Sequence, residues 1–253
     1  MKKINPRVIP VLTLKGDSLI KTQKFKSHKY IGDPLNAVKI FNEKEVDELV
    51  ILDIFACKEN RAPNFKLLKN IATECFMPLA YGGGIQNLSD IKNVFNQGVE
   101  KVILNTQATN YDLLNNAAQI YGNQSIVVSI DVKKDFWGKY QIYSVSGTKK
   151  VKITLDEHLK NISEAGAGEV IIQSIDNDGM MNGFDLNLID VVSNKLNLPL
   201  VAIGGAGNLN HFKEAFQHGA SGIAASSFFV FKGKLNAVLI SYPSQKELNS
   251  IFK

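Results

Sequence analysis

The stretch Tyr81-Gly-Gly-Gly-Ile-Gln-Asn-Leu88 returns half a chain later as Ile203-Gly-Gly-Ala-Gly-Asn-Leu209. Each copy ends an apolar run with glycines, and the segments that follow share the same order of apolar residues, lysine and glycine. The two segments then lead into the apolar runs 101–106 and 222–227. A repeat at a fixed period is a strong signal of fold. The sequence therefore predicts that a strand, a glycine turn, a helix and a further strand have been duplicated.

The glycine turns are candidate phosphate sites. A glycine-rich turn between a strand and a helix lets backbone N–H groups approach an anion, and the helix N-terminus adds a partial positive charge. Polar pairs at matched strand ends, Asn105-Thr106 and Ser226-Ser227, support this interpretation. The alternative is that the glycines only permit tight turns.

Strand-like and helix-like segments alternate eight times. The apolar runs are continuous, which is typical of parallel strands covered on both faces. The predicted strands are 7–13, 48–54, 78–81, 101–105, 125–131, 169–174, 198–203 and 222–225. The predicted helices are 34–44, 65–75, 88–97, 111–121, 155–165, 186–196, 209–218 and 235–241.

This alternation predicts a single (β/α)8 TIM barrel over residues 1–253, built from two duplicated half barrels at about 1–122 and 123–253. A doubly wound open sheet is the alternative, but it does not explain the internal repeat. Two long connections, 14–33 and 132–151, are expected to be lids or binding loops, with a small hairpin at 140–144. In such barrels the chemistry lies at the C-terminal ends of the strands.

Composition limits the possible partners. The net charge of +5 and the pI near 9 suit anionic partners, but no basic block dominates, which favours small phosphorylated ligands over nucleic acid. Cys57 and Cys75 lack metal-ligand spacing, and the four histidines are scattered, so neither a metal nor a cofactor is expected and the histidines are expected at the surface. No apolar run approaches the roughly 18 residues of a membrane span. We therefore expect a cytoplasmic protein with no membrane partner.

Several motifs together resemble the cyclase subunit (HisF family) of imidazole glycerol phosphate synthase, over nearly the whole chain. They are Arg7-Val-Ile-Pro10, Gly32-Asp-Pro34, Asp47-Glu-Leu-Val-Ile-Leu-Asp53, Gly82-Gly-Gly-Ile85, Ser129-Ile-Asp131, Gly166-Ala-Gly-Glu169, Ser174-Ile-Asp-Asn-Asp-Gly179 and Gly204-Gly-Ala-Gly-Asn-Leu209. The resemblance implies a barrel that docks to a glutaminase subunit as a heterodimer. Ammonia from the glutaminase would pass through the barrel and attack a substrate that carries two phosphates.

The resemblance also implies roles for individual residues. One phosphate would be held by Gly82, Gly83, Asn105 and Thr106. The other would be held in a site shaped by Asp178, Gly179, Gly204, Gly205, Ala225 and Ser226. Because a carboxylate repels phosphate, Asp178 is expected to orient the Gly179 backbone or a ligand hydroxyl. At the opposite end, Arg7, Glu48, Lys101 and Glu169 match a charged ring that gates ammonia, although charged residues commonly flank strands.

The match fails at one catalytic position. The family uses two aspartates as an acid/base pair, which suits carboxylates whose pKa values are split by their surroundings. Asp131 is one of them and Lys21 matches a family lysine, but Thr13 stands where the family has the second aspartate. A threonine hydroxyl hydrogen-bonds but is no base near neutral pH.

Three functions remain open. Segments such as Lys24-Phe-Lys26, Phe76-Met-Pro78 and residues 237–244 resemble a paralogous group linked to surface polysaccharides, in which ammonia helps to convert an acetamido group of a sugar into an acetamidino group. That function adds a third, sugar-amidating enzyme as a possible partner. The alternatives are a genuine cyclase of histidine biosynthesis and a non-catalytic barrel that activates or scaffolds the glutaminase.

Overall fold

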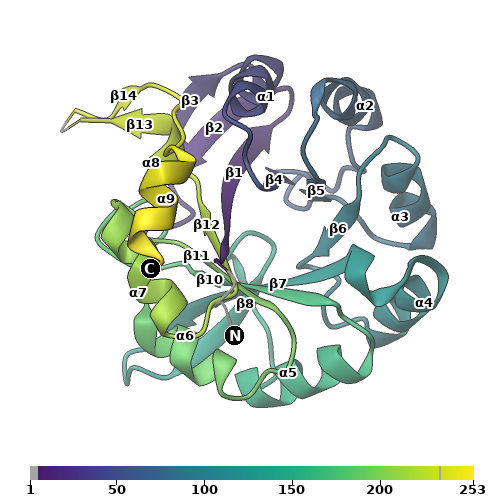
Figure 1. Cartoon of the computed structure of the whole chain (residues 1–253). Coiled ribbons are helices and arrows are strands. Elements are labelled where there is room, and N and C mark those ends of the chain that lie inside the picture. The colour runs from purple at the N-terminus through teal and green to yellow at the C-terminus, as the bar shows by residue number, and fades with distance from the viewer. Residues whose placement is uncertain (1–4, 234) are drawn as a thin grey trace.

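The chain forms a closed (β/α)8 barrel, as predicted (Figure 1). The computed structural model describes residues 5–233 and 235–253. The barrel strands all run parallel, and the pairing of β7 with β10 closes the sheet. In barrel order they are β1 (Arg7–Lys15), β4 (Leu49–Asp53), β5 (Leu79–Gly82), β6 (Lys101–Leu104), β7 (Ile126–Lys134), β10 (Glu169–Ser174), β11 (Leu200–Ile203) and β12 (Gly222–Ala225).

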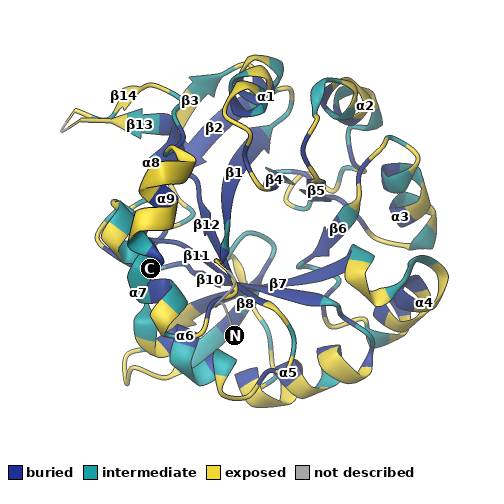
Figure 2. Ribbon diagram, in the orientation of Figure 1, coloured by how far each residue is buried: buried dark blue, intermediate teal, exposed yellow. Residues whose placement is uncertain are grey.

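Amphipathic helices surround the strands, with their inner faces buried and their outer faces exposed (Figure 2). They are α1 (Pro34–Glu43), α2 (Phe65–Glu74), α3 (Leu88–Phe95), α4 (Tyr111–Tyr121), α5 (Leu155–Glu164), α6 (Leu186–Ser193), α7 (Leu209–Gln217), α8 (Ser227–Val230) and α9 (Gln245–Ile251), with a 3-10 turn at Asn123–Ser125. Within the described residues, no helix combines the length and the apolar character needed to cross a membrane.

The two glycine turns end in matching helix caps. The Asn87 side chain accepts a hydrogen bond from the Asp90 backbone N–H at the start of α3, and Asn208 accepts one from His211 at the start of α7. Both capping residues are extended, which is the usual N-cap geometry. Each turn therefore delivers the chain directly into a helix whose N-terminus lies beside the end of a barrel strand.

Side chains along each barrel strand alternate between the helices and the barrel interior. On β1, Val8 and Leu12 belong to the layer between strands and helices, whereas Ile9 and Val11 belong to a separate inner cluster. Ile9, Val11, Val50, Ala80, Ile103, Val127, Ile171, Val201, Ile203 and Ala224 make up this inner cluster. The barrel centre is thus an apolar column with polar side chains above and below it.

The long connections after β1 and β7 contain additional strands. β2 (Ser18–Thr22) and β3 (His28–Gly32) form a hairpin that pairs with the end of β1. β8 (Tyr140–Ser144) pairs antiparallel with β7 and with β9 (Lys149–Lys150), so residues 140–144 form a single strand shared by two hairpins and not a hairpin by themselves.

The predicted helix at 235–241 is wrong. Asn236 has a left-handed backbone (φ 49°), and β14 (Ala237–Val238) pairs with β13 (Phe231–Lys232) in a small hairpin. The apolar residues that suggested a helix, including Leu235 and Leu239, are exposed. The eighth helical position is instead filled by the short α8 and by α9.

Candidate functional site

A cavity of about 350 Å³ lies at the C-terminal ends of the barrel strands. It brings together every residue predicted from the sequence for catalysis or phosphate binding: Thr13, Lys21, Asp131, Gly82, Gly83, Asn105, Thr106, Asp178, Gly179, Gly204, Gly205, Ala225 and Ser226. The floor includes the apolar side chains of Val11, Leu52 and Ile203. The pocket therefore has polar side chains around its rim and apolar side chains at its base. The roles of these residues stay predictions.

The glycine turns allow close backbone contacts around the pocket. Gly83 has φ 123°, and a Cβ there would lie 2.4 Å from the Asp53 carbonyl oxygen. Gly205 has φ 111°, and a Cβ there would lie 2.0 Å from the carbonyl oxygen of Gly183. Only glycine fits such positions. Each turn therefore packs against a neighbouring backbone segment in a way that requires glycine.

We expect Gly83→Ala to weaken the binding of inorganic pyrophosphate about tenfold or more, because one displaced turn loses charge-assisted backbone hydrogen bonds. Isothermal titration calorimetry measures the effect. Gly138→Ala is the matched control, since Gly138 also has a positive φ, but a Cβ there would meet nothing within 4 Å and the residue lies away from the pocket. Equal affinities of the two variants would contradict the assignment.

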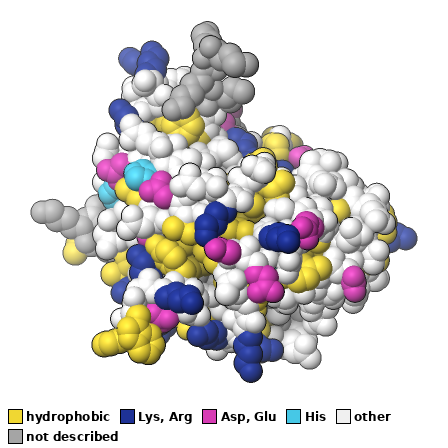
Figure 3. All heavy atoms as spheres, turned by 90° about the horizontal axis from the view of Figure 1, so that it is seen from below, with side chains coloured by type: hydrophobic (Ala, Val, Ile, Leu, Met, Phe, Trp, Pro, Cys, Tyr) yellow, Lys and Arg dark blue, Asp and Glu magenta, His cyan; other side chains and the backbone are white. Residues whose placement is uncertain are grey.

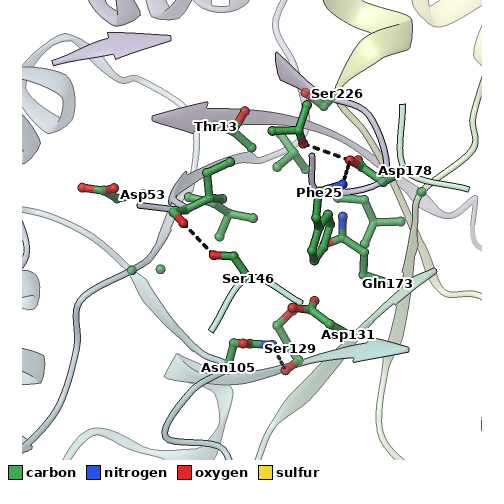
Figure 4. A pocket seen from close by; sticks show the side chains of 18 of the residues that line it. Thr13, Phe25, Asp53, Asn105, Ser129, Asp131, Ser146, Gln173, Asp178 and Ser226 are labelled. Atoms are coloured by element: carbon green, nitrogen blue, oxygen red, sulfur yellow. Dashed lines mark hydrogen bonds between the residues drawn. The ribbon is translucent and has the colours of Figure 1, made fainter. Parts of the chain in front are cut away.

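Asp131 is a buried carboxyl group of the pocket, near Asn105 and Ser129 (Figure 4). Burial raises the pKa of Asp131 to about 7; the charge of Asp178 acts in the same direction, and the Asn105 amide opposes it. Asn105 is itself held by donating to the Ser129 carbonyl oxygen at 3.0 Å. At neutral pH this carboxyl group is therefore populated in both protonation states, as a proton donor or acceptor must be.

Thr13 faces Asp131 from the opposite wall of the pocket (Figure 4). Its hydroxyl donates to the Ile20 carbonyl oxygen within the β1–β2 hairpin, so its proton is not available to a ligand. The oxygen can still accept a hydrogen bond from a ligand. The position provides no second titratable group.

Lys21 and Asp178 form a buried ion pair, 2.8 Å from Nζ to Oδ1. The other oxygen of Asp178 accepts from the Thr22 hydroxyl at 3.0 Å and from the Phe25 backbone N–H at 3.4 Å. Beside it, Gly179 passes so close to Thr22 that a Cβ would lie 2.4 Å from its carbonyl oxygen. Asp178 therefore fastens the connection between β2 and β3 onto the pocket rim. This contact was not part of the sequence-based interpretation.

Phe25 and Ser146 close the pocket from the side, and they lie in the two long connections that were expected to be lids or binding loops. The Phe25 ring lies against Gly147, where a Cβ would be 2.8 Å from Cδ2 of the ring. Ser146 donates to the Ile54 carbonyl oxygen at 2.6 Å (Figure 4). Three loops thus meet over the site, and no local pattern predicts contacts between loops.

Asp53 is the last residue of β4 and lines the pocket, although it was not predicted as a site residue. Its carboxylate accepts from the Phe55 and Ala56 backbone N–H groups at 3.2 and 3.0 Å, and Arg61 lies 3.1 Å away. These contacts use the carboxylate to shape the loop after β4. A period-two pattern along β7 and β10 could have indicated Ser129 and Gln173, which line the pocket from inward positions.

The charged ring consists of Arg7, Glu48, Lys101 and Glu169, which meet at the N-terminal ends of the barrel strands. Lys101 Nζ lies 2.9 Å from Glu48 and 3.0 Å from Glu169, and Arg7 pairs with both carboxylates. The glutamates are nearly buried, at 5% and 7% side-chain exposure. The ring caps the apolar column opposite the pocket.

Some polar residues lie outside the site. Asp176 accepts from the Lys134 backbone N–H, and Ser174 donates to Asn177, so both fasten the end of β10. The expectation that all histidines are at the surface is wrong for His158, which is 1% exposed and 3.0 Å from the Tyr111 hydroxyl. Burial lowers the pKa of His158 to about 4. It faces the core of α4 and α5, not the pocket.

Comparison with known proteins places this architecture in a family. The family model described as histidine biosynthesis protein matches residues 7–236. A protein of Pseudomonas aeruginosa, provisionally named imidazole glycerol phosphate synthase subunit hisF2, is 46% identical over 97% of this chain and 99% of its own. Imidazole glycerol phosphate synthase subunit HisF of Natranaerobius thermophilus is 37% identical over 95% of this chain and 96% of its own. The chain therefore belongs to the HisF family of histidine biosynthesis proteins.

Proposed function

We propose that this chain is the barrel subunit of a glutamine-dependent amidotransferase of the imidazole glycerol phosphate synthase type. It takes ammonia from a glutaminase subunit in a heterodimer and presents it to a small phosphorylated substrate at the barrel mouth. One observation carries the proposal: a single apolar column joins a charged ring at one end to a pocket with two glycine turns and a titratable carboxyl group at the other.

The column suits neutral ammonia. Apolar walls offer no hydrogen bonds that would retain it, and they disfavour an ammonium ion, because an unpaired charge in such surroundings is costly. The paired charges of the ring hold that end shut in the isolated chain. Docking of the glutaminase on this face would have to rearrange at least one ring contact, so the ring acts as a gate.

The residues at the barrel mouth have different roles in binding and catalysis. The glycine turns, with Asn105 and Ser226, supply donors for two phosphate groups. Asp131 takes up a proton from the attacking nitrogen or returns one to the substrate, because its pKa of about 7 makes both steps accessible. Lys21 keeps Asp178 and the loop above it in place. Thr13 accepts a hydrogen bond from the substrate.

We further propose that the chain serves the paralogous function, acetamidino modification of a sugar in surface polysaccharide biosynthesis, together with a third, sugar-amidating enzyme. Two observations support this choice over histidine biosynthesis. Because Thr13 stands where the family has an aspartate, the pocket lacks one of the two family carboxylates. The relatives at 44–46% identity also carry provisional names, hisF2 and hisF3 among them, whereas those named plainly as subunit HisF are 35–37% identical.

We expect Thr13→Asp to raise ammonium-dependent turnover of the doubly phosphorylated histidine-pathway substrate by about 10²-fold, because a second general acid/base group typically contributes at least that much. The initial rate at saturating ammonium measures it. Thr13→Asn is the matched control, since it has the size of aspartate without a titratable group. Similar rates for the two variants would show that the missing carboxylate does not limit this reaction.

The same assay separates the alternatives. Rapid turnover by the unmodified chain, lost in Asp131→Asn, would establish the histidine-pathway cyclase instead. If the chain stimulated the glutaminase but gave no product from the histidine-pathway substrate or from the acetamido sugar, it would be a non-catalytic scaffold. Amidation of an acetamido sugar that depends on this chain, the glutaminase and the third enzyme together is the result that the proposal predicts.

A further inference from the structure

An exposed pair of aromatic side chains projects from the mouth end of the barrel. Val132 is the last residue of β7 with a parallel partner, and beyond it β7 and β8 continue as a two-stranded hairpin. The turn at its end presents Phe136 and Trp137, which are 95% and 87% exposed. Their ring centroids are 5.9 Å apart, edge to face. Adjacent large apolar side chains at this exposure mark a surface that contacts a partner.

The turn holds the two rings in place. Asp135 Oδ1 accepts from the backbone N–H groups of Trp137 at 3.0 Å and Lys139 at 2.9 Å. The Asp135 backbone N–H donates to the Lys139 carbonyl oxygen, and Gly138 takes up the positive φ of 78° that the turn requires. The aromatic pair is therefore preorganised and does not fold back onto the protein.

Lysines flank the aromatic pair at positions 133, 134 and 139, and three more follow where β8 pairs with β9, while Asp176 and Asp185 contact Lys134. Residues 133–152 contain six lysines and one acidic residue, Asp135, so this segment alone has the full net charge of +5 and the rest of the chain balances to zero. All six lysines are exposed, and only Lys134 has an acidic partner, Asp185, among the ion pairs of the described residues. On the face shown in Figure 3, hydrophobic, basic and acidic side chains lie side by side.

We propose that the β7–β8 hairpin is a peripheral docking element for an anionic lipid surface. Phe136 and Trp137 enter the headgroup layer, where aromatic rings are favoured, and the lysines reach the lipid phosphates. The expectation of no membrane partner rested on the lack of a spanning segment, which surface contact does not require. The proposal is independent of the reaction at the pocket.

The shape of the hairpin favours lipid over a protein partner. A stable protein interface buries about 800 Å² on each side and is depleted of lysine at its centre. Here two rings stand on a convex tip among lysines, and the surface around them is not apolar. A lipid headgroup layer is deformable, so it can surround such a tip without having a complementary shape. The lysines attract the protein to the anionic lipids before the rings make contact.

Trp137 provides a direct test, because it is the single tryptophan of the chain. Vesicles of phosphatidylcholine with phosphatidylglycerol should shift its emission to shorter wavelength and sediment the protein, whereas vesicles of phosphatidylcholine alone should do neither. Lys133→Gln together with Lys139→Gln should lower the partition coefficient about 25-fold, since each lysine near an anionic surface contributes about fivefold. Phe136→Ser, which keeps the fluorophore, should lower it roughly tenfold.

The controls match these variants in exposure but lie elsewhere. Phe76→Ser changes a side chain that is 86% exposed before the N-terminal end of β5, and Lys66→Gln with Lys69→Gln changes two exposed lysines of α2. Circular dichroism checks that every variant is folded. Absence of binding to the anionic vesicles, or equal losses in the control variants, would overturn the proposal. A shift that depends on protein concentration without lipid would also overturn it, because it would mean that a second copy covers the tip.

Discussion

Replacing Lys101 with methionine should lower the free energy of unfolding by about 3 kcal/mol or more, because it leaves Glu48 and Glu169 buried with only Arg7 to balance them. Breaking a buried charge network by removing one partner is costly, since the remaining charge stays desolvated. Urea-induced unfolding followed by circular dichroism measures the effect.

Two further variants make that experiment specific. Lys195→Met removes the exposed pair with Asp156 and should cost less than about 1 kcal/mol. Adding Glu48→Met to Lys101→Met leaves the Arg7–Glu169 pair balanced and should recover part of the loss, as expected for coupled sites. If Lys101→Met cost no more than Lys195→Met, the four side chains would not form a buried network.

The second large effect concerns Asp131. Its pKa is about 7 in the folded chain against 3.8 for an ordinary aspartate, so the folded state holds a proton that the unfolded state releases between these two values. The stability linked to this proton is therefore present in full below pH 3.8 and is lost as the pH rises through 7. Asp131→Asn, which cannot ionise, should make the protein more stable at pH 8 by up to about 4 kcal/mol.

The measurement compares urea unfolding of the two proteins at pH 5 and pH 8. The stabilising effect of Asp131→Asn should be largest at pH 8 and smaller at pH 5. Asp112→Asn is the control, because Asp112 lies exposed in the first turn of α4. A gain of the same size at both pH values would contradict a raised pKa. Loss of catalysis in the more stable variant would show that the buried carboxyl group is retained for its chemistry.

The internal repeat and the alternation of strand-like and helix-like segments were enough to predict the barrel, and the resemblance to the HisF family indicated the residues of the pocket. Because parallel strands end at one rim, residues as distant as Gly83 and Gly204 could be placed together from order alone. The resemblance to the HisF family implied the ring, and the structure brings Arg7, Glu48, Lys101 and Glu169 together at the N-terminal ends of the strands.

Other features depend on contacts that no local pattern contains. The position of Phe25 follows from its packing on Gly147, and the state of Asp131 follows from its burial. Segment 235–241 has the composition of a helix, but its residues 237–238 form a strand, because tertiary pairing with β13 overrides local propensity. The exposed aromatic pair at 136–137 was also missed. The length of the connection indicated a loop, but it did not indicate that the end of this loop projects into solvent.

The most direct test of the conduit is an isotope experiment on the complex with its glutaminase. Glutamine labelled with ¹⁵N in its amide is supplied together with an excess of unlabelled ammonium, and the nitrogen incorporated into the amidated product is analysed by mass spectrometry. Passage through the barrel predicts a product that carries mostly ¹⁵N. A product with the isotopic composition of the dissolved ammonium would contradict the account.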